Sequence, residues 1–236
     1  MASFLSDVLS SLAASGVVVF LGWAMSSRLR RWLVRLLSLL TGTGVLRTYQ
    51  RQLDAEDDLS RDIARARWLK VLTGRGNALT RDAFAPVWSR SASRVESAWI
   101  LLPDPERGPD SWLGQREDDV RRFDPGFTPG LLAEQVRANS AYLGEVARTR
   151  AGVELRYYDL PNIYRVVATD RAAYITFYES TAHGRHSPCV YAQRPGPLYD
   201  AALRMVSAAW RGSRPAVGAR AAGPRPLSEG GGSLPG

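Results

Sequence analysis

The chain has 236 residues, 45% of them hydrophobic and 9% aromatic, so it can bury the core of one medium-sized domain with appendages. Most of its net charge of +8 lies in the flanks, because residues 28–35 and 211–236 carry four arginines each, and the only acidic residues in the two terminal regions are Asp7 and Glu229. The remaining residues 36–210 carry a net charge of +2. This near-neutral segment argues against a nucleic-acid-binding domain, which needs a basic surface on its folded part.

Residues 8–27, VLSSLAASGVVVFLGWAMSS, contain no charged side chain. As a helix they would reach about 30 Å at 1.5 Å per residue, the thickness of a bilayer core. A cleavable signal peptide would carry a basic residue before the apolar run, and none is present. A buried core helix would not explain the arginines that follow at once. The pattern therefore favours a single transmembrane signal anchor over residues 1–27.

Residues 28–44 are predicted to form a basic amphipathic juxtamembrane helix, with Arg28, Arg30, Arg31 and Arg35 opposite Trp32 and several leucines. Such a helix suits the surface of an anionic membrane, although a helix docked on the domain is the alternative. The positive-inside rule then places the bulk of the chain in the cytoplasm, at the inner (plasma) membrane.

Residues 45–66 mix both charge signs and predict a solvated helical linker. The domain is predicted to span residues 67–211, and 212–236 to form a disordered tail, because Gly, Pro, Ala and Ser dominate there. Apolar runs predict strands over 67–73, 97–105, 153–159, 164–169, 172–179 and 187–194, and helical spacing predicts helices over 79–94, 112–123, 128–150 and 195–213. Alternation of strands and helices at the start of the domain indicates an α/β fold with a mixed β-sheet flanked by helices.

Two turns could bind a ligand, because ligands of open α/β sheets favour the carboxyl ends of the parallel strands. The turn TGRGN at 73–77 offers backbone amides and Arg75, but it lacks the glycine pattern of a dinucleotide site and the lysine of a P-loop. A tight turn with Asn77 near a helix start is the structural alternative. Asp104 lies in the second turn, PDPERGPD, where a proline-bounded aspartate can simply shape the chain.

The sequence is short of catalytic groups. His183 and His186 are the only histidines and lie in one predicted loop, and Cys189 is the only cysteine, so neither a metal site nor a disulfide is expected. No Gly-x-Ser-x-Gly, His-Glu-x-x-His or Cys-x-x-Cys pattern occurs. No cofactor is therefore predicted.

Residues 67–211 resemble a phospholipase-D-like half domain, in their order of elements and in the phrases LLPDP, ELRYYDLP, ATDRAAYITFYE and PLYDAAL. Active members of that superfamily carry His-x-Lys-x-x-x-x-Asp, with the histidine as nucleophile and the lysine on phosphate. On this chain Asp170 matches the aspartate, Arg165 takes the lysine's place and Ile163 takes the histidine's place. An isoleucine cannot form a phospho-enzyme, so the resemblance implies the fold without the hydrolase chemistry.

The resulting prediction is a membrane-anchored, cytoplasm-facing, non-catalytic module that acts as a sensor, scaffold or partner-binding domain, in the bacterial signalling or defence setting that the resemblance suggests. Its ligand-binding candidates are Arg75, Asn77, Asp104, Arg165 and Asp170. The partners are expected to be the membrane and an unidentified protein or small anionic ligand; since active relatives pair two halves, a homodimer is also favoured. The alternatives are a phosphodiesterase or nuclease rebuilt from Arg165, Asp170 and a loop histidine, and nucleic-acid binding through the arginine-rich tail.

Overall fold

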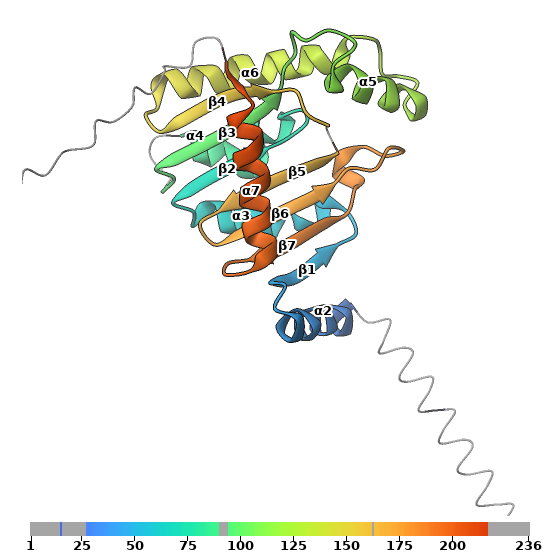
Figure 1. Cartoon of the computed structure of the whole chain (residues 1–236), viewed down its shortest axis with the longest axis vertical. Helices are drawn as coiled ribbons and strands as arrows, with labels where there is room; N and C mark the ends of the chain where they lie inside the picture. The colour runs from blue at the N-terminus through green and yellow to red at the C-terminus, as the bar shows by residue number, and fades with distance from the viewer. Residues whose placement is uncertain (1–14, 16–26, 90–93, 162, 217–236) are drawn as a thin grey trace, which may run out of the picture.

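The computed structural model describes residues 15, 27–89, 94–161 and 163–216, and its centre is one eight-stranded mixed β-sheet (Figure 1). The strands are β1 (Val45–Tyr49), β2 (Trp68–Leu72), β3 (Ser97–Pro103), β4 (Val153–Tyr158), β5 (Tyr164–Thr169), β6 (Ala172–Phe177), β7 (Cys189–Gln193) and β8 (Arg214–Pro215). Their spatial order is β1-β7-β6-β5-β2-β3-β4-β8. Strands β2, β3 and β4 run parallel, and the other neighbouring pairs are antiparallel.

Helices cover both faces of this sheet. They are α2 (Ser27–Thr41), α3 (Glu56–Ala64), α4 (Ala85–Trp88), α5 (Trp112–Phe123), α6 (Leu131–Thr149) and α7 (Pro197–Arg211), with 3-10 turns η1 (Gln52–Ala55), η2 (Asn77–Thr80), η3 (Asp82–Phe84) and η4 (Gly184–His186). Helix α7 crosses one face, where it packs in the smaller core, and apolar residues of α3, α4, α5 and α6 pack in the larger core on the other face (Figure 1). The central strands are buried on both faces, which explains their almost continuous apolar sequences.

The mixed α/β sheet with flanking helices is confirmed, but the fold class with a preceding transmembrane helix is corrected. Across the residues that the structure describes, no helix has both the length and the apolar character needed to cross a membrane. The proposed anchor itself, residues 1–27, lies outside the described residues except for Ser15 and Ser27.

The segment 45–66 differs from the solvated linker that its charges predicted. Residues 45–49 form edge strand β1, which pairs with β7, and α3 buries Leu59 and Ile63 on the larger core. Two carboxylates of α3 contact strands of the sheet: Tyr174 on β6 donates a hydrogen bond to Asp62 at 2.7 Å, and Asp58 pairs with Arg47 of β1. The alternating charges of this segment therefore belong to a helix that packs on the domain, rather than to a solvated linker.

Helix boundaries depend on contacts that the sequence pattern does not contain. The predicted helix over 79–94 is three short turns, η2, η3 and α4, and residues 90–93 are not described. Helix α6 begins at Leu131 rather than at Thr128. Its first amides are capped from α5 by Glu117, whose carboxylate accepts hydrogen bonds from the Gly130 and Leu132 amides at 2.5 and 2.9 Å.

Candidate anion-binding site

The candidate site lies at the carboxyl edge of the three parallel strands. Because β5 is antiparallel to β2 and β6 is antiparallel to β5, this edge also holds the start of β5 and the end of β6. The β2–η2 turn requires a glycine at Gly76, which has φ +84° and whose added Cβ would lie 2.9 Å from Leu102 Cδ2. The turn thus brings Arg75 to this edge in a fixed backbone conformation.

Arg75 is half-buried, and its guanidinium lies 5.6 Å from the ring centroid of Phe127. Burial lowers the pKa of Arg75, and the neighbouring charges of Arg116 and Arg185 lower it further, against the opposing effects of Tyr178 and Asp124. Within the described part of the chain, its side chain makes no hydrogen bond and no ion pair. Arginine nevertheless stays protonated in proteins, so this is a positive charge without a carboxylate in ion-pair contact, although the charge of Asp124 opposes it from farther away.

Arg116 of α5 ties the β6–β7 loop to the same edge. Its guanidinium donates hydrogen bonds to the carbonyls of Glu179 and Ala182 at 3.2 and 3.1 Å, and it lies 5.9 Å from the ring centroid of Tyr178. Burial lowers the pKa of Arg116. The loop that it holds carries Arg185, which is exposed, so three guanidiniums contribute positive potential at this edge.

His183, on the same loop, faces an acidic partner. Its Nε2 lies 3.2 Å from Asp124 Oδ2, and its ring packs edge-to-face on Phe123. Burial lowers the pKa of His183, and the charge of Arg75 lowers it further, against the opposing effect of Asp124. The imidazole is therefore neutral at pH 7 and pairs with Asp124 as a hydrogen-bonding group. No cluster of three or more His, Cys, Asp or Glu suited to a metal ion occurs among the described residues.

Two of the predicted ligand candidates are used within the fold. Asn77 accepts a hydrogen bond from Asn139 Nδ2 of α6 at 2.6 Å, and the same amide donates to the Arg75 carbonyl at 2.9 Å. Asp104 is 6% exposed and accepts two hydrogen bonds at 2.6 Å from Arg214 of β8. Asn77 and Asp104 therefore have structural partners. The contact of Asp104 with Arg214 also shows that the folded domain reaches β8, beyond the predicted boundary at 211.

Arg165 and Asp170 do not form one site. They lie at opposite ends of β5, roughly 17 Å apart for five residues of extended chain. Asp170 accepts a hydrogen bond from the Arg67 amide at 3.0 Å and borders an open cleft of about 290 Å³ with Trp68 and Arg194. Arg165 lies at the carboxyl edge but is buried beneath η1, and Ile163 beside it is 61% exposed.

The membrane-surface candidates belong to α2. Trp32 and Arg35 are exposed on this helix. The structure does not describe the side chains of Arg28, Arg30 and Arg31. The helix itself lies beside β1 at one edge of the sheet (Figure 1).

Sequence analysis missed the contribution of Arg116 and Arg185 to this edge. In a chain with 31 Lys and Arg residues, neither stands in a recognisable motif. Only the fold shows that α5 and the β6–β7 loop meet beside Arg75.

Comparison with known proteins gives limited information. No protein-family model and no curated protein sequence matches the chain. Among solved structures, TrmBL2, an archaeal chromatin protein that binds DNA, aligns with a TM-score of 0.43 and 11% identity over 89% of this chain and 70% of that one. Nuc from Salmonella typhimurium, a phospholipase D family member, aligns with a TM-score of 0.43 and 15% identity over 69% of this chain and 90% of that one. At these identities and TM-scores, neither alignment carries an inference about this chain.

Proposed function

We propose that this protein is a non-catalytic binding module that recognises a phosphate-bearing ligand at the carboxyl edge of its sheet. The observation that carries the proposal is Arg75, a half-buried guanidinium beside two other guanidiniums, which makes no ion pair among the described residues and feels the Asp124 carboxylate only from a distance. A bound anion would balance this charge, and its hydrogen bonds to guanidinium groups would be charge-assisted.

The arrangement suits a phosphate more than a simple carboxylate. Neither Arg75 nor Arg185 makes a side-chain hydrogen bond or ion pair within the described part of the chain, and each can present a two-pronged set of donors to phosphate oxygens. Arg116 is committed to two loop carbonyls, so it contributes charge rather than a direct contact. Neutral His183 uses its one N–H on Asp124, so its other ring nitrogen can only accept a hydrogen bond at the rim.

The same geometry argues for binding without hydrolysis. The place of the family's nucleophile holds exposed Ile163, and the separation of Arg165 from Asp170 removes the pair on which a rebuilt phosphodiesterase site would depend. A ligand held by Arg75, α5 and the β6–β7 loop would link three segments. This linkage suits a sensor that reports ligand binding to a partner.

The test is calorimetric titration of the full chain with inorganic pyrophosphate. Arg75→Met should weaken binding roughly 10- to 100-fold, because it removes charge-assisted hydrogen bonds. Arg121→Met is the matched control, since Arg121 of α5 is exposed and pairs with Asp118 on the surface. Equal affinities for the wild type and Arg75→Met would refute the site, and turnover of a phosphodiester such as bis(4-nitrophenyl) phosphate would refute the absence of catalysis.

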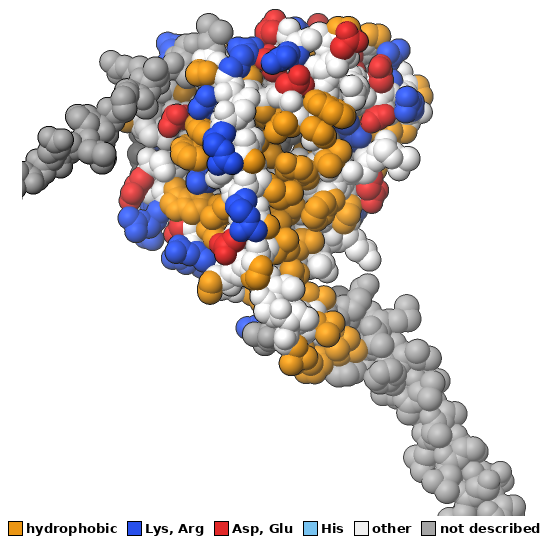
Figure 2. Space-filling model, viewed as in Figure 1, with side chains coloured by type: hydrophobic (Ala, Val, Ile, Leu, Met, Phe, Trp, Pro, Cys, Tyr) orange, Lys and Arg blue, Asp and Glu red, His pale blue; other side chains and the backbone are white. Residues whose placement is uncertain are grey.

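A second candidate function, binding to an anionic membrane surface, rests on α2. Figure 2 shows hydrophobic side chains gathered on the surface of this helix. Its exposed apolar residues share one face of the helix and are Trp32, Leu33, Leu36, Leu37 and Leu40, between 37% and 75% exposed. Ser38, on the opposite side, is buried, and Arg35 is exposed beside the apolar face. An apolar face flanked by arginine is typical of helices that lie on anionic lipid.

Co-sedimentation of the full chain with vesicles tests this second proposal. Binding should be stronger to vesicles containing phosphatidylglycerol than to pure phosphatidylcholine. Replacing Leu36 and Leu37 by serine should weaken it several-fold, whereas Leu53→Ser, an equally exposed leucine on η1, should not. Unchanged binding of the double variant would mean that α2 does not contact lipid.

A further inference from the structure

The His183–Asp124 pair lies beside the proposed phosphate site and can take up one more proton. His183 Nε2 is 3.2 Å from Asp124 Oδ2, and the two side chains are 31% and 35% exposed, so water reaches both. The other oxygen of this carboxylate accepts a hydrogen bond from the Gly126 amide at 3.2 Å, which fixes its position. Protonation of His183 would therefore turn an existing hydrogen bond into an ion pair without moving either group.

Two connections hold this pair next to the arginines of the site. The Phe127 amide donates a hydrogen bond to the Asp124 carbonyl at 3.0 Å, and the ring of Phe127 has its centroid 5.6 Å from the Arg75 guanidinium. From the other side, Arg116 donates hydrogen bonds to two carbonyls of the β6–β7 loop, which carries His183. The pair and the arginines thus form one cluster.

The charges of this cluster keep the imidazole of His183 neutral at pH 7. Burial and the charge of Arg75 lower its pKa, Asp124 raises it through its charge and its hydrogen bond, and Arg185 lowers it. The positive charges and burial together outweigh the carboxylate. The charged and titratable groups that act on His183 or on Arg75 are, from α5 and its C-terminal end, Arg116 and Asp124, and from the β6–β7 loop, Tyr178 and Arg185.

We propose that His183 is a further residue of this site and takes up one proton when a phosphate-bearing ligand binds. The negative charge of the ligand offsets Arg75 and Arg185, which disfavour the imidazolium, while Asp124 continues to favour it. The proton comes from the solvent, and the imidazolium then has two N–H groups, only one of which Asp124 uses. Ligand binding and protonation strengthen each other. The inference rests on the proposed phosphate site and adds a proton to its binding reaction.

Affinity should therefore fall as the pH rises. In the complex, His183 keeps its proton to a higher pH than in the free protein, whose imidazole already has a pKa below the ordinary value of about 6.5. The gain in affinity is complete below the pKa of the free protein and is lost as the pH rises through the pKa of the complex. An opposite charge close to a histidine makes this gain roughly tenfold.

The test is calorimetric titration of the full chain with inorganic pyrophosphate in two buffers of different ionisation enthalpy, which counts the protons taken up. At pH 6.5 the wild type should take up more protons than His183→Gln, by up to about one for each ligand. Protons exchanged by pyrophosphate itself are common to both proteins. From pH 5.5 to 8, the affinity of the wild type relative to His183→Gln should fall roughly tenfold.

His186→Gln is the matched control. His186 is the other histidine of the chain, lies on the same loop and is exposed, so this variant should match the wild type in proton count and pH dependence. A loss of the pH dependence in His186→Gln would refute the assignment to His183.

A measurement on the wild type covers the case in which His183→Gln does not fold. In NMR titrations, pyrophosphate should raise the pKa of His183, with the signals of His186 as the internal reference. Without ligand, Arg75→Met should also raise the pKa of His183, because it removes a charge that disfavours the imidazolium.

The possible failures are distinguishable. No binding of pyrophosphate to the wild type would refute the phosphate site, and this inference with it. Binding with equal proton counts in the wild type and His183→Gln, or with an unchanged titration of His183, would refute this inference alone. An unchanged pKa of His183 in Arg75→Met would contradict the electrostatic coupling on which it depends.

Discussion

The Asp104–Arg214 pair provides a sharp test of how this fold is held at its edge. Asp104 follows β3, and Arg214 lies in the two-residue strand β8, which pairs with β4. The carboxylate accepts hydrogen bonds from Nε and Nη2 of Arg214, both at 2.6 Å, and another from the Glu106 amide. Asp104→Asn keeps the size of the side chain but removes its charge and one of its two acceptors.

The expected loss follows from burial. Breaking a fully buried ion pair costs 3–5 kcal/mol, but here only Asp104 is buried, whereas the Arg214 side chain is 41% exposed and can regain water. A hydrogen bond to a charged group contributes about 1.5–3 kcal/mol. We therefore expect Asp104→Asn to lower the free energy of unfolding by about 2 kcal/mol, and Tm by roughly 4–8 °C for a chain of this size.

Urea unfolding followed by circular dichroism measures this change. The matched control is Asp118→Asn, which breaks an exposed pair with Arg121 on α5 and should cost less than about 0.5 kcal/mol. A double-mutant cycle with Arg214→Met should give a coupling energy above about 1 kcal/mol. Equal losses in Asp104→Asn and Asp118→Asn would refute the argument that burial makes this pair stabilising.

The pH dependence gives a second check on the same pair. Burial alone would raise the pKa of Asp104, but hydrogen bonds from Arg214 and the Glu106 amide, with the arginine charge, lower it overall. A carboxyl with a lowered folded-state pKa stabilises the fold above its unfolded pKa of about 4 and loses this contribution as the pH falls through the folded value. The difference between the wild type and Asp104→Asn should therefore be constant from pH 6 to 8 and shrink below pH 4.

Two further substitutions test other parts of the fold. Gly76→Ala should lower the free energy of unfolding, measured in urea, by about 1–2 kcal/mol, because φ is +84° and the new Cβ would meet Leu102. The control Gly108→Ala, with φ +77° but open space around it, should lower it less. A neutral effect of Gly76→Ala would contradict the tight packing of this turn. Tyr174→Phe should lower the free energy of unfolding by about 1 kcal/mol, because it removes the hydrogen bond to Asp62. Stability equal to that of the wild type would show that this bond does not hold α3 to the sheet.

Much of the sheet was predictable because its strands are short apolar runs separated by turns. Strands β2 to β7 fall within the predicted segments. The signal is clearest for β5 and β6, because burial on both faces demands an almost continuous apolar sequence. Strand β1 was not predicted, because VLRTY is an edge strand that leaves Arg47 and Thr48 exposed. Strand β8 was not predicted either, because a two-residue strand has no pattern of its own and depends on Arg214 reaching Asp104.

The candidate site was less predictable than the fold, because its charges come from segments far apart in sequence. Arg75 could be proposed from its turn after a strand, but Arg116 and Arg185 join it only through the packing of α5 against the β6–β7 loop. Asn77 and Asp104 were proposed by the same reasoning, and both have partners inside the fold. A turn sequence therefore does not reveal whether its polar side chain faces solvent, a ligand or the fold itself.

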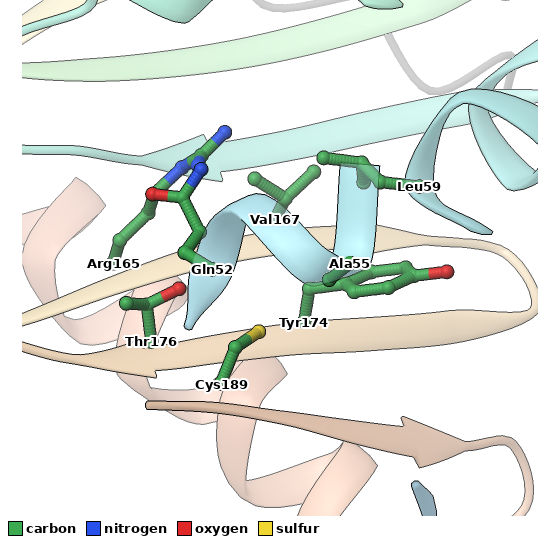
Figure 3. Close-up of a pocket in the computed structure, with 8 residues that line it drawn as sticks. All are labelled: Gln52, Ala55, Leu59, Arg165, Val167, Tyr174, Thr176 and Cys189. Atoms are coloured by element: carbon green, nitrogen blue, oxygen red, sulfur yellow. The ribbon is translucent and has the colours of Figure 1, made fainter. Parts of the chain in front are cut away.

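The register of the β5–β6 hairpin separates Arg165 from Asp170. An antiparallel strand carries the residue at its start to one edge of the sheet and the residue after its end to the other, so Arg165 and Asp170 have separate environments. Asp170 binds a backbone amide near the amino ends of the parallel strands, which is a structural role that any fold with this turn could retain. Arg165 is buried and lines a small pocket with Gln52 and Ala55 of η1 (Figure 3). Of the two arginines at the carboxyl edge, Arg75 is thus the one placed to meet a ligand from solvent, whereas Arg165 is 5% exposed.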